Sequence, residues 1–365
     1  MLFRIIPIIF LGGMSLYFYT VLLRINRWRE LNLNSFILFI ILLLIILPAM
    51  NIFGVWFLTL LHLFEIGLLV EIINFILKKF DIKYWDIIYN SFSLPVIITI
   101  FLFSYGYYNI NNIKRVEYNL TTEKNIYKSQ YKIGLLSDLH FENSLDQEKL
   151  RELIEKLNKE NLDILILAGD IVDEKNTLEE VQKTFKTLGK TKTLNGIYYI
   201  YGNHDTSRYR RKPNYGIEDL KEAIKKEKIV LLEDKSVEID DNVIIVGRKD
   251  KSFKSRKTTD KLIENLDKSK YIIIADHQPV ELEKNSRLGY DLQVSGHTHN
   301  GQIFPANLII KFFNLAEFIY GNKKIEKFNI IVTSGVSGWG YPLRTAGDSE
   351  YVIINILKDK EVDYE

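Results

Sequence analysis

Five short polar motifs lie after residue 130, and each follows a run of apolar residues typical of a β-strand. The motifs are Ser137-Asp138-Leu139-His140, Gly169-Asp170, Gly202-Asn203-His204-Asp205, Asp276-His277-Gln278-Pro279 and Gly296-His297-Thr298-His299-Asn300-Gly301-Gln302. Of the six histidines in the chain, five lie in these motifs. Histidines packed in a core would not concentrate at strand ends, whereas imidazole, carboxylate and amide groups together form a common ligand set for metal ions. The sequence therefore predicts a metal cluster.

The absence of cysteine limits what this cluster can be. Without cysteine the chain can form neither a disulfide framework nor a thiolate metal site, and its redox compartment stays open. Any metal must be held by nitrogen and oxygen atoms, a ligand set that suits manganese, iron, zinc or cobalt without choosing among them. An Asp-x-His pair such as Asp138 and His140 occurs often by chance, so its place after a strand and within the set favours ligation.

The order of the motifs resembles that of the calcineurin-like metallophosphoesterase superfamily. The Asp-His-Gln-Pro and Gly-His-Thr-His-x-Gly-Gln forms resemble its membrane-anchored bacterial branch, and the likeness covers roughly residues 130–356. This resemblance implies an α/β fold, a calcineurin-like four-layer α/β/β/α sandwich, with a dinuclear metal site at one edge.

Carried over position by position, the resemblance implies two divalent metal ions that share the bridging carboxylate of Asp170. It assigns the first metal ion to Asp138, His140 and His299, and the second to Asn203, His277 and His297. His204 matches the uncoordinated catalytic histidine of the family. No metal-ligand position departs from the family pattern.

Such a ligand set permits hydrolysis of a phosphate ester or pyrophosphate bond by attack of a metal-bridged hydroxide. Two cations about 3.5–4 Å apart acidify a water molecule and neutralise the phosphoryl oxygens. His204 would then stabilise a phosphoryl oxygen or protonate the leaving alkoxide.

Four further residues have candidate roles around this site. Asp205 either orients a site histidine or caps a turn, and Asp173 and Asp276 are candidate partners of the ligating histidines. Arg344, at the end of a glycine-rich loop, could contact a substrate phosphate through its planar guanidinium, or it could be a surface charge.

The elements that must position these residues read as an α/β layered pattern. Strands are predicted at 132–136, 162–167, 197–201, 243–246, 271–274, 292–294, 330–333 and 352–356, and helices at 147–160, 178–188 and 217–226. Because open α/β sheets bind ligands at the carboxyl ends of their strands, the motifs are expected to meet there.

Nearly all long apolar runs lie before residue 110, so the chain is predicted to divide into two domains. Residues 1–115 would form a multi-pass transmembrane domain of about four helices, at 5–23, 36–50, 52–77 and 92–109, and residues 120–365 the catalytic domain. A cleavable signal peptide fits the first run poorly, because no small-residue cleavage site follows it and arginines come next.

Cations in the short loops indicate the sidedness of this domain. One loop would carry Arg24, Arg27 and Arg29, and another Lys78, Lys79 and Lys83. If both loops are cytoplasmic, the chain after Tyr108 lies outside the cell membrane, although Lys114 and Arg115 argue for the opposite orientation.

Two hydrophobic regions, the third predicted crossing and the segment 308–320, can each be interpreted in two ways. His62, Glu65 and Glu71 lie within the third predicted crossing and could be functional groups or helix-packing residues. The apolar segment 308–320 is expected to be an amphipathic helix packed on the sheet, and the alternative is a flap that touches the bilayer or a lipid chain.

The formal net charge of +2 argues against a protein that binds nucleic acid through a strongly basic surface. The expected function is a membrane-anchored phosphoesterase, with a lipid-linked phosphate as a candidate substrate and no obligate protein partner. A phosphatase or phosphodiesterase for soluble nucleotides is the alternative. A non-catalytic scaffold of the same fold would have lost ligands, whereas all seven ligand candidates and His204 are present here.

Overall fold

The computed structural model describes residues 2–80, 82–126 and 128–359. The chain forms two compact units, Met1–Gly106 and Tyr107–Glu365.

Unit 1 is helical. Its helices are α1 (Leu2–Trp28), α2 (Ser35–Ile46), a 3₁₀ turn η1 (Leu47–Met50), α3 (Val55–Leu77), α4 (Trp85–Asn90) and the first part of α5 (Ser93–Asn111). Helices occupy all four predicted ranges, and Pro48 lies in the 3₁₀ turn that separates α2 from α3. The short helix α4 was not predicted. Among the described residues, α3 and α5 are long and apolar enough to cross a membrane, and Ser35–Met50 is a shorter apolar segment.

The polar residues of unit 1 pair with one another. Arg24 lies within α1, and its Nη1 atom is 2.6 Å from Oε1 of Glu71. The hydroxyl of Tyr89 donates to the other oxygen of Glu71 at 2.6 Å, and Nδ1 of His62 lies 3.0 Å from the Leu58 carbonyl. These contacts favour a helix-packing role for Glu71. The assignment of Arg24 and Arg27 to a loop was wrong, because α1 continues to Trp28.

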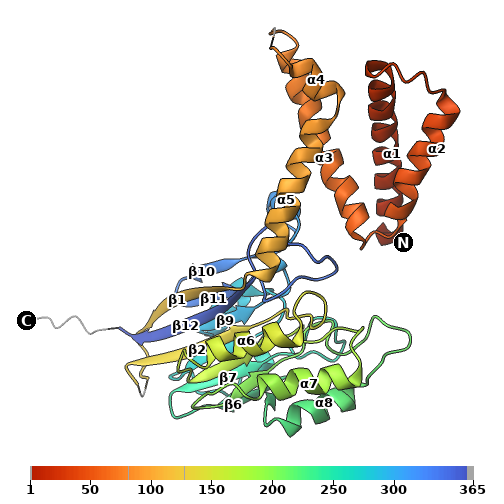
Figure 1. The fold of residues 1–365 in the computed structure, drawn as a ribbon. Coiled ribbons are helices and arrows are strands. Elements are labelled where there is room, and N and C mark those ends of the chain that lie inside the picture. Colours follow the sequence, from red (N-terminus) through yellow and green to blue (C-terminus); the bar gives the residue numbers. More distant parts are fainter. Residues whose placement is uncertain (1, 81, 127, 360–365) are drawn as a thin grey trace, which may run out of the picture. The chain divides into compact units, whose positions relative to one another are not determined.

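Unit 2 contains two six-stranded mixed sheets (Figure 1). In spatial order the first sheet has β1 (Lys114–Thr122), β12 (Glu350–Lys358), β2 (Gln130–Leu136), β3 (Ile164–Leu167), β4 (Ile197–Tyr199) and β5 (Val230–Leu231). The second has β10 (Gly321–Ile325), β11 (Phe328–Val332), β9 (Leu292–Ser295), β8 (Tyr271–Ala275), β7 (Val243–Gly247) and β6 (Lys235–Glu238). The strands β2 to β5 are parallel to one another, as are β7, β8, β9 and β11.

Alternation of side chains along the strands builds the layers, because successive residues point to opposite faces of a sheet. Leu165 and Leu167 of β3 pack with the helices α6 (Gln147–Leu157), α7 (Leu178–Leu188) and α8 (Ile217–Lys226). Ile164 and Ile166 pack between the two sheets, against residues such as Ile273 of β8. The outer face of the second sheet packs with α9 (Thr259–Ile263) and α10 (Leu282–Leu288). The predicted four-layer α/β/β/α order is present in unit 2.

All eight predicted strands and all three predicted helices are present, and four strands were missed. Both β1 and β10 are largely exposed and polar, and β5 and β6 are short, so their sequences lack a clear apolar alternation. The strand β1 spans the interval in which the domain boundary was predicted.

The apolar segment 308–320 differs from the packed helix that was expected. Its helix, α11 (Ala306–Phe312), has no buried residue. The exposed fraction of the side chain is 84% for Phe312 and 64% for Phe313. The expectation of a helix packed on the sheet is therefore wrong for α11, whereas Phe318 and Ile319 at the end of the segment pack on the protein.

Candidate metal centre

The motif residues meet at one edge of unit 2, because they follow the carboxyl ends of parallel strands in both sheets. Asp138 and His140 follow β2, and Asp170 follows β3. The remaining motif residues follow three strands: Asn203 and His204 follow β4, His277 follows β8, and His297 and His299 follow β9.

One group of ligand atoms belongs to Asp138, His140 and His299, all three of which are buried. Nε2 of His299 lies 3.3 Å from Oδ1 of Asp138 and 3.3 Å from Nε2 of His140. A single cation could bind all three side chains, because the candidate ligand atoms lie within 4.8 Å of one another.

A second group belongs to Asp170, His277 and His297. Oδ2 of Asp170 lies 3.1 Å from Nε2 of His277 and 3.8 Å from Nε2 of His140, which belongs to the first group. The carboxylate of Asp170 therefore lies between the two groups, as a bridging ligand requires.

Two buried polar atoms test whether this site fits metal ions. Oδ1 of Asn203 has no hydrogen-bond partner among the described residues, and Nε2 of His277 faces the Asp170 carboxylate at 3.1 Å. Nδ1 of His277 lies 2.8 Å from the Ala168 carbonyl, which orients the ring and leaves Nε2 available as a ligand. Buried polar atoms normally have partners, so a cation would satisfy what the protein leaves open.

The backbone at the site is strained. Positive φ angles occur at five of the ligand candidates, namely Asp138 (54°), His140 (39°), Asp170 (52°), His297 (70°) and His299 (49°). Such conformations cost roughly 1–3 kcal/mol each outside glycine and concentrate at functional sites. Glycine makes room nearby, since a Cβ atom at Gly202 would lie 2.1 Å from Oδ1 of Asp170.

Asp205 holds the turn that carries Asp170. Its two carboxylate oxygens accept four backbone N–H groups, which belong to Asp170, Ile171, Val172 and Gly202. Its carboxylate has no site histidine among these partners. Of the two roles predicted for Asp205, the structure favours the cap of a turn.

The two other candidate partners of histidines have different settings. Oδ2 of Asp173 lies 3.2 Å from Nδ1 of His140, as expected for a residue that orients a ligand. The carboxylate of Asp276 is instead paired with Arg248 and Arg256. The expected contact of Asp276 with a site histidine is not present.

His204 lies beside the two groups and contacts residues that the sequence did not identify. Its Nδ1 atom is 2.7 Å from Oε1 of Glu174. Its ring centroid is 5.3 Å from that of Trp339 and 5.4 Å from that of Tyr209. Only the position of Glu174 next to Asp173, directly after the Gly-Asp motif, could have suggested its role.

Charges around the site set the protonation of the histidines. Burial lowers the pKa of His299 to about 3, so its imidazole is neutral and able to bind a metal. Burial opposes protonation of His277 as well, but the Asp170 carboxylate raises the pKa of His277 well above its usual value. His277 must lose that proton to act as a ligand, so cation binding is coupled to proton release.

His204 is the other histidine with a raised pKa. Burial lowers it, but the hydrogen bond to Glu174 and the nearby carboxylates outweigh burial and raise the pKa of His204 to about 9. A histidine that keeps its proton at neutral pH can donate it to a leaving group.

Arg344 does not face the metal site, as a residue that contacts a substrate phosphate would have to. Its side chain is fully buried, and Nη1 donates to the His299 carbonyl at 3.0 Å. Nη2 donates to the carbonyls of Ser334 and Ser337 at 2.9 and 2.5 Å. Arg344 therefore holds backbone around the ligand His299, and neither a substrate contact nor a surface charge describes it.

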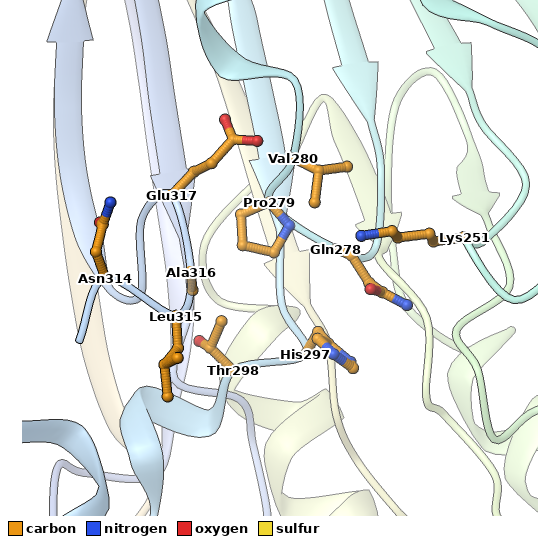
Figure 2. A pocket seen from close by; sticks show the side chains of 10 residues that line it. All are labelled: Lys251, Gln278, Pro279, Val280, His297, Thr298, Asn314, Leu315, Ala316 and Glu317. Atoms are coloured by element: carbon orange, nitrogen blue, oxygen red, sulfur yellow. The ribbon is translucent and has the colours of Figure 1, made fainter. Parts of the chain in front are cut away.

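A groove of about 310 Å³ lies beside His297 (Figure 2). Its polar lining includes Lys251 and Gln278, and its apolar lining includes Val280 and Leu315. Lys251 and Gln278 were not predicted as site residues, because no motif marks Lys251 and Gln278 counted only as part of a histidine motif.

Comparison with known proteins found similarity over part of this chain. Residues 131–301 match the calcineurin-like phosphoesterase family. A metallophosphoesterase of Helicobacter pylori is 30% identical over 235 residues, which are 62% of this chain and 60% of that protein. A metallophosphoesterase of Campylobacter jejuni is 28% identical over 301 residues, which are 80% of this chain and 76% of that protein.

A protein of Danio rerio described as a transmembrane protein with metallophosphoesterase domain is 27% identical over 281 residues, which are 72% of this chain and 62% of that protein. The chain spans about 60% of the length of the Helicobacter pylori relative.

Proposed function

Because the chain contains a calcineurin-like metallophosphoesterase domain, we propose that it hydrolyses a phosphate ester or pyrophosphate bond with two divalent metal ions. The observation that carries this proposal is the position of Asp170 between two groups of ligand atoms. A scaffold of the same fold would not need this complete set of ligands.

The ligand assignment follows the two groups. Asp138, His140 and His299 hold one metal ion, Asn203, His277 and His297 hold the other, and Asp170 contacts both. When bound, the pair of ions supplies a water molecule of lowered pKa and neutralises the phosphoryl oxygens. Nitrogen and oxygen ligands suit manganese, iron, zinc or cobalt.

His204 supplies the proton in this proposal. Glu174 accepts from Nδ1 of His204, which leaves the proton on Nε2 for the leaving oxygen. Tyr209 and Trp339 contact the ring and limit its rotation.

We further propose that unit 1 anchors the enzyme in the cell membrane through about four crossings. In α3 and α5 only 28% of the most apolar window is buried, whereas the core helix of a soluble protein would be mostly buried. Apolar side chains that are exposed on these helices include Phe75 and Phe101. The name of the Danio rerio relative supports the same arrangement. The loop cations favour an extracytoplasmic catalytic unit.

The substrate in this proposal is a phosphorylated molecule at the membrane, and a lipid-linked phosphate is favoured over a soluble nucleotide by the exposed apolar helix α11.

The test uses the full-length protein in detergent, stripped with a chelator and reloaded with manganese. We expect hydrolysis of p-nitrophenyl phosphate or bis-p-nitrophenyl phosphate to return with about two metal ions per chain. Full activity with one ion per chain would overturn the two-metal proposal. Lipid phosphates and nucleotides assayed in parallel would distinguish the two substrate classes.

A further inference from the structure

An apolar surface on unit 2 has no covering element among the described residues. Six large side chains in and around α11 are exposed, and the exposed fraction ranges from 40% for Phe304 to 84% for Phe312. We call this set the α11 patch; its members are Phe304, Leu308, Ile309, Phe312, Phe313 and Leu315. Clustered apolar side chains of this size usually mark an interaction site.

The α11 patch continues into the groove beside the metal centre, because Leu315 belongs to both. Figure 2 shows Leu315 on one side of the groove and Lys251 with Gln278 on the other. His297, a ligand candidate, also lines the groove. A molecule bound in the groove would therefore meet the metal centre, a cation and an apolar surface.

The polar side of the groove has one cationic side chain in its lining, Lys251. Lys251 is exposed and has no ion-pair partner among the described residues. Arg208 lies close to it in the fold, since Nη1 of Arg208 donates to Ser252 at 3.2 Å. Arg208 begins a run of exposed cations after the catalytic motif, which also includes Arg210, Arg211 and Lys212. Glu317, the acidic residue of the groove, accepts two backbone N–H groups at 2.9 Å.

The last turn of α5, which belongs to unit 2, contacts a loop next to the α11 patch. Asn109, in the last turn of α5, donates to the carbonyls of Arg344 and Gly347 at 3.4 and 3.3 Å. The backbone N–H of Phe304, the first residue of the α11 patch, donates to Thr345 at 2.9 Å. A single loop therefore contacts both the end of α5 and the start of the α11 patch.

We propose that the groove binds the non-phosphoryl part of an anionic amphiphile taken from a bilayer. An anionic group of its head contacts Lys251, its hydrocarbon chain passes over Leu315, and the α11 patch inserts into the lipid. Apolar burial and cationic attraction together are how proteins bind anionic membrane surfaces. This inference rests on the proposed phosphoesterase function and specifies the substrate class of its site.

The first test measures inhibition of p-nitrophenyl phosphate hydrolysis by butyl, octyl and dodecyl phosphate below their micelle concentrations. For the wild-type full-length protein we expect the inhibition constant to fall about tenfold or more from butyl to dodecyl, because each buried methylene adds to binding. Leu315→Asp and Leu315→Ala should each reduce the ratio of the butyl to the dodecyl inhibition constant. Lys251→Ala should weaken inhibition by dodecyl diphosphate more than inhibition by dodecyl phosphate. Leu194→Asp is the matched control, because Leu194 is 73% exposed and lies at the opposite strand ends.

The second test separates a bilayer source from a free amphiphile. The wild-type protein and the Phe312→Asp/Phe313→Asp variant are reconstituted in vesicles that contain dodecyl phosphate. Inhibition of each protein in the vesicles is then compared with its inhibition by dodecyl phosphate in detergent solution. We expect the variant to lose inhibition more strongly in vesicles than in detergent. Equal inhibition constants of the wild-type protein for all chain lengths would overturn the proposed substrate class. Equal losses of inhibition by the variant in vesicles and in detergent would overturn the bilayer as the source of the amphiphile. If p-nitrophenyl phosphate itself is not hydrolysed, the proposed function has failed instead.

Discussion

Asp170 and His204 lie within 3 Å of each other, yet their proposed roles predict opposite responses to substitution. The backbone N–H of His204 donates to Oδ1 of Asp170 at 2.8 Å, while Oδ2 of Asp170 faces His277 and His140. We expect Asp170→Asn to lose metal, because a neutral amide neutralises neither cation. His204→Ala should keep nearly all metal and slow turnover by roughly 10²-fold or more, through loss of a proton donor.

Metal content and turnover of both variants would be measured on the same preparations, with exposed Glu179→Gln as the control. If His204→Ala lost a metal ion, the assignment of His204 as an uncoordinated residue would be wrong.

Glu174 should set the pH range of activity through His204. Burial lowers the pKa of His204, but the hydrogen bond that Nδ1 donates to Glu174 contributes most to raising it to about 9. The protonated form is the donor, so activity is present below this pKa and is lost as the pH rises through it. Replacing Glu174 with glutamine removes a negative charge and should shift the alkaline limb of the pH–rate profile to lower pH.

The shift between the pH–rate profiles of the wild-type protein and Glu174→Gln is the measured quantity. An unchanged alkaline limb in Glu174→Gln would show that Glu174 does not control this proton.

Metal binding should itself depend on pH. Asp170 raises the pKa of His277 well above its usual value, so His277 releases a proton when it becomes a ligand. Metal affinity is therefore expected to fall as the pH is lowered. Calorimetry of manganese binding in buffers of different ionisation enthalpy would measure the released protons, and buffer-independent heats would contradict this coupling.

Among the elements, the turn after β3 is the one whose stability should be most sensitive to a single side chain. Asp205→Ala would leave four buried N–H groups without acceptors, and each such group costs roughly 1–3 kcal/mol. We expect a large fall in thermal stability together with loss of metal, because the same turn carries Asp170.

Asp219→Ala is a matched control, since among the described residues its carboxylate accepts one N–H, that of Gly216, at the exposed start of α8. Thermal unfolding of both variants with and without chelator would separate fold stability from metal stabilisation. Comparable losses in the two variants would mean that Asp205 acts only as a local cap.

At the scale of the whole molecule, the arrangement in the membrane can be tested on intact cells. Arg27 in the last turn of α1, Arg29 directly after it and the cations at 78–83 favour a cytoplasmic position for the two loops there, which places unit 2 outside. Added protease should then degrade unit 2 and spare epitope tags inserted in those loops. Protection of unit 2 would place the catalytic site in the cytoplasm.

Lys114 and Arg115, at the start of unit 2, argue for the opposite orientation in the membrane, but their ion pairs make them compatible with an external unit 2. Lys114 lies 2.9 Å from Asp348 and Arg115 lies 2.7 Å from Glu160, so both belong to the folded catalytic unit. The cation Arg24 belongs to unit 1, where it pairs with Glu71.

The sequence by itself identified the fold and the candidate metal ligands, because both depend on local patterns. Apolar runs predicted the eight central strands, and each ligand motif lies within a few residues of a strand end. Parallel strands bring their carboxyl ends to one edge, so the convergence of His140, Asp170 and His277 followed without any knowledge of contacts.

Only the tertiary structure decided which partner each polar side chain uses. Glu174, and not Asp173, contacts Nδ1 of His204, and Asp276 pairs with two arginines. Arg344 is buried on carbonyls that include His299, 45 residues away in the chain. Similarly, the apolar sequence of α11 indicates that burial of this helix would be favourable, but it does not show whether other parts of the protein cover the helix. These outcomes depend on how segments distant in sequence approach one another, and the residue types alone are compatible with several partners.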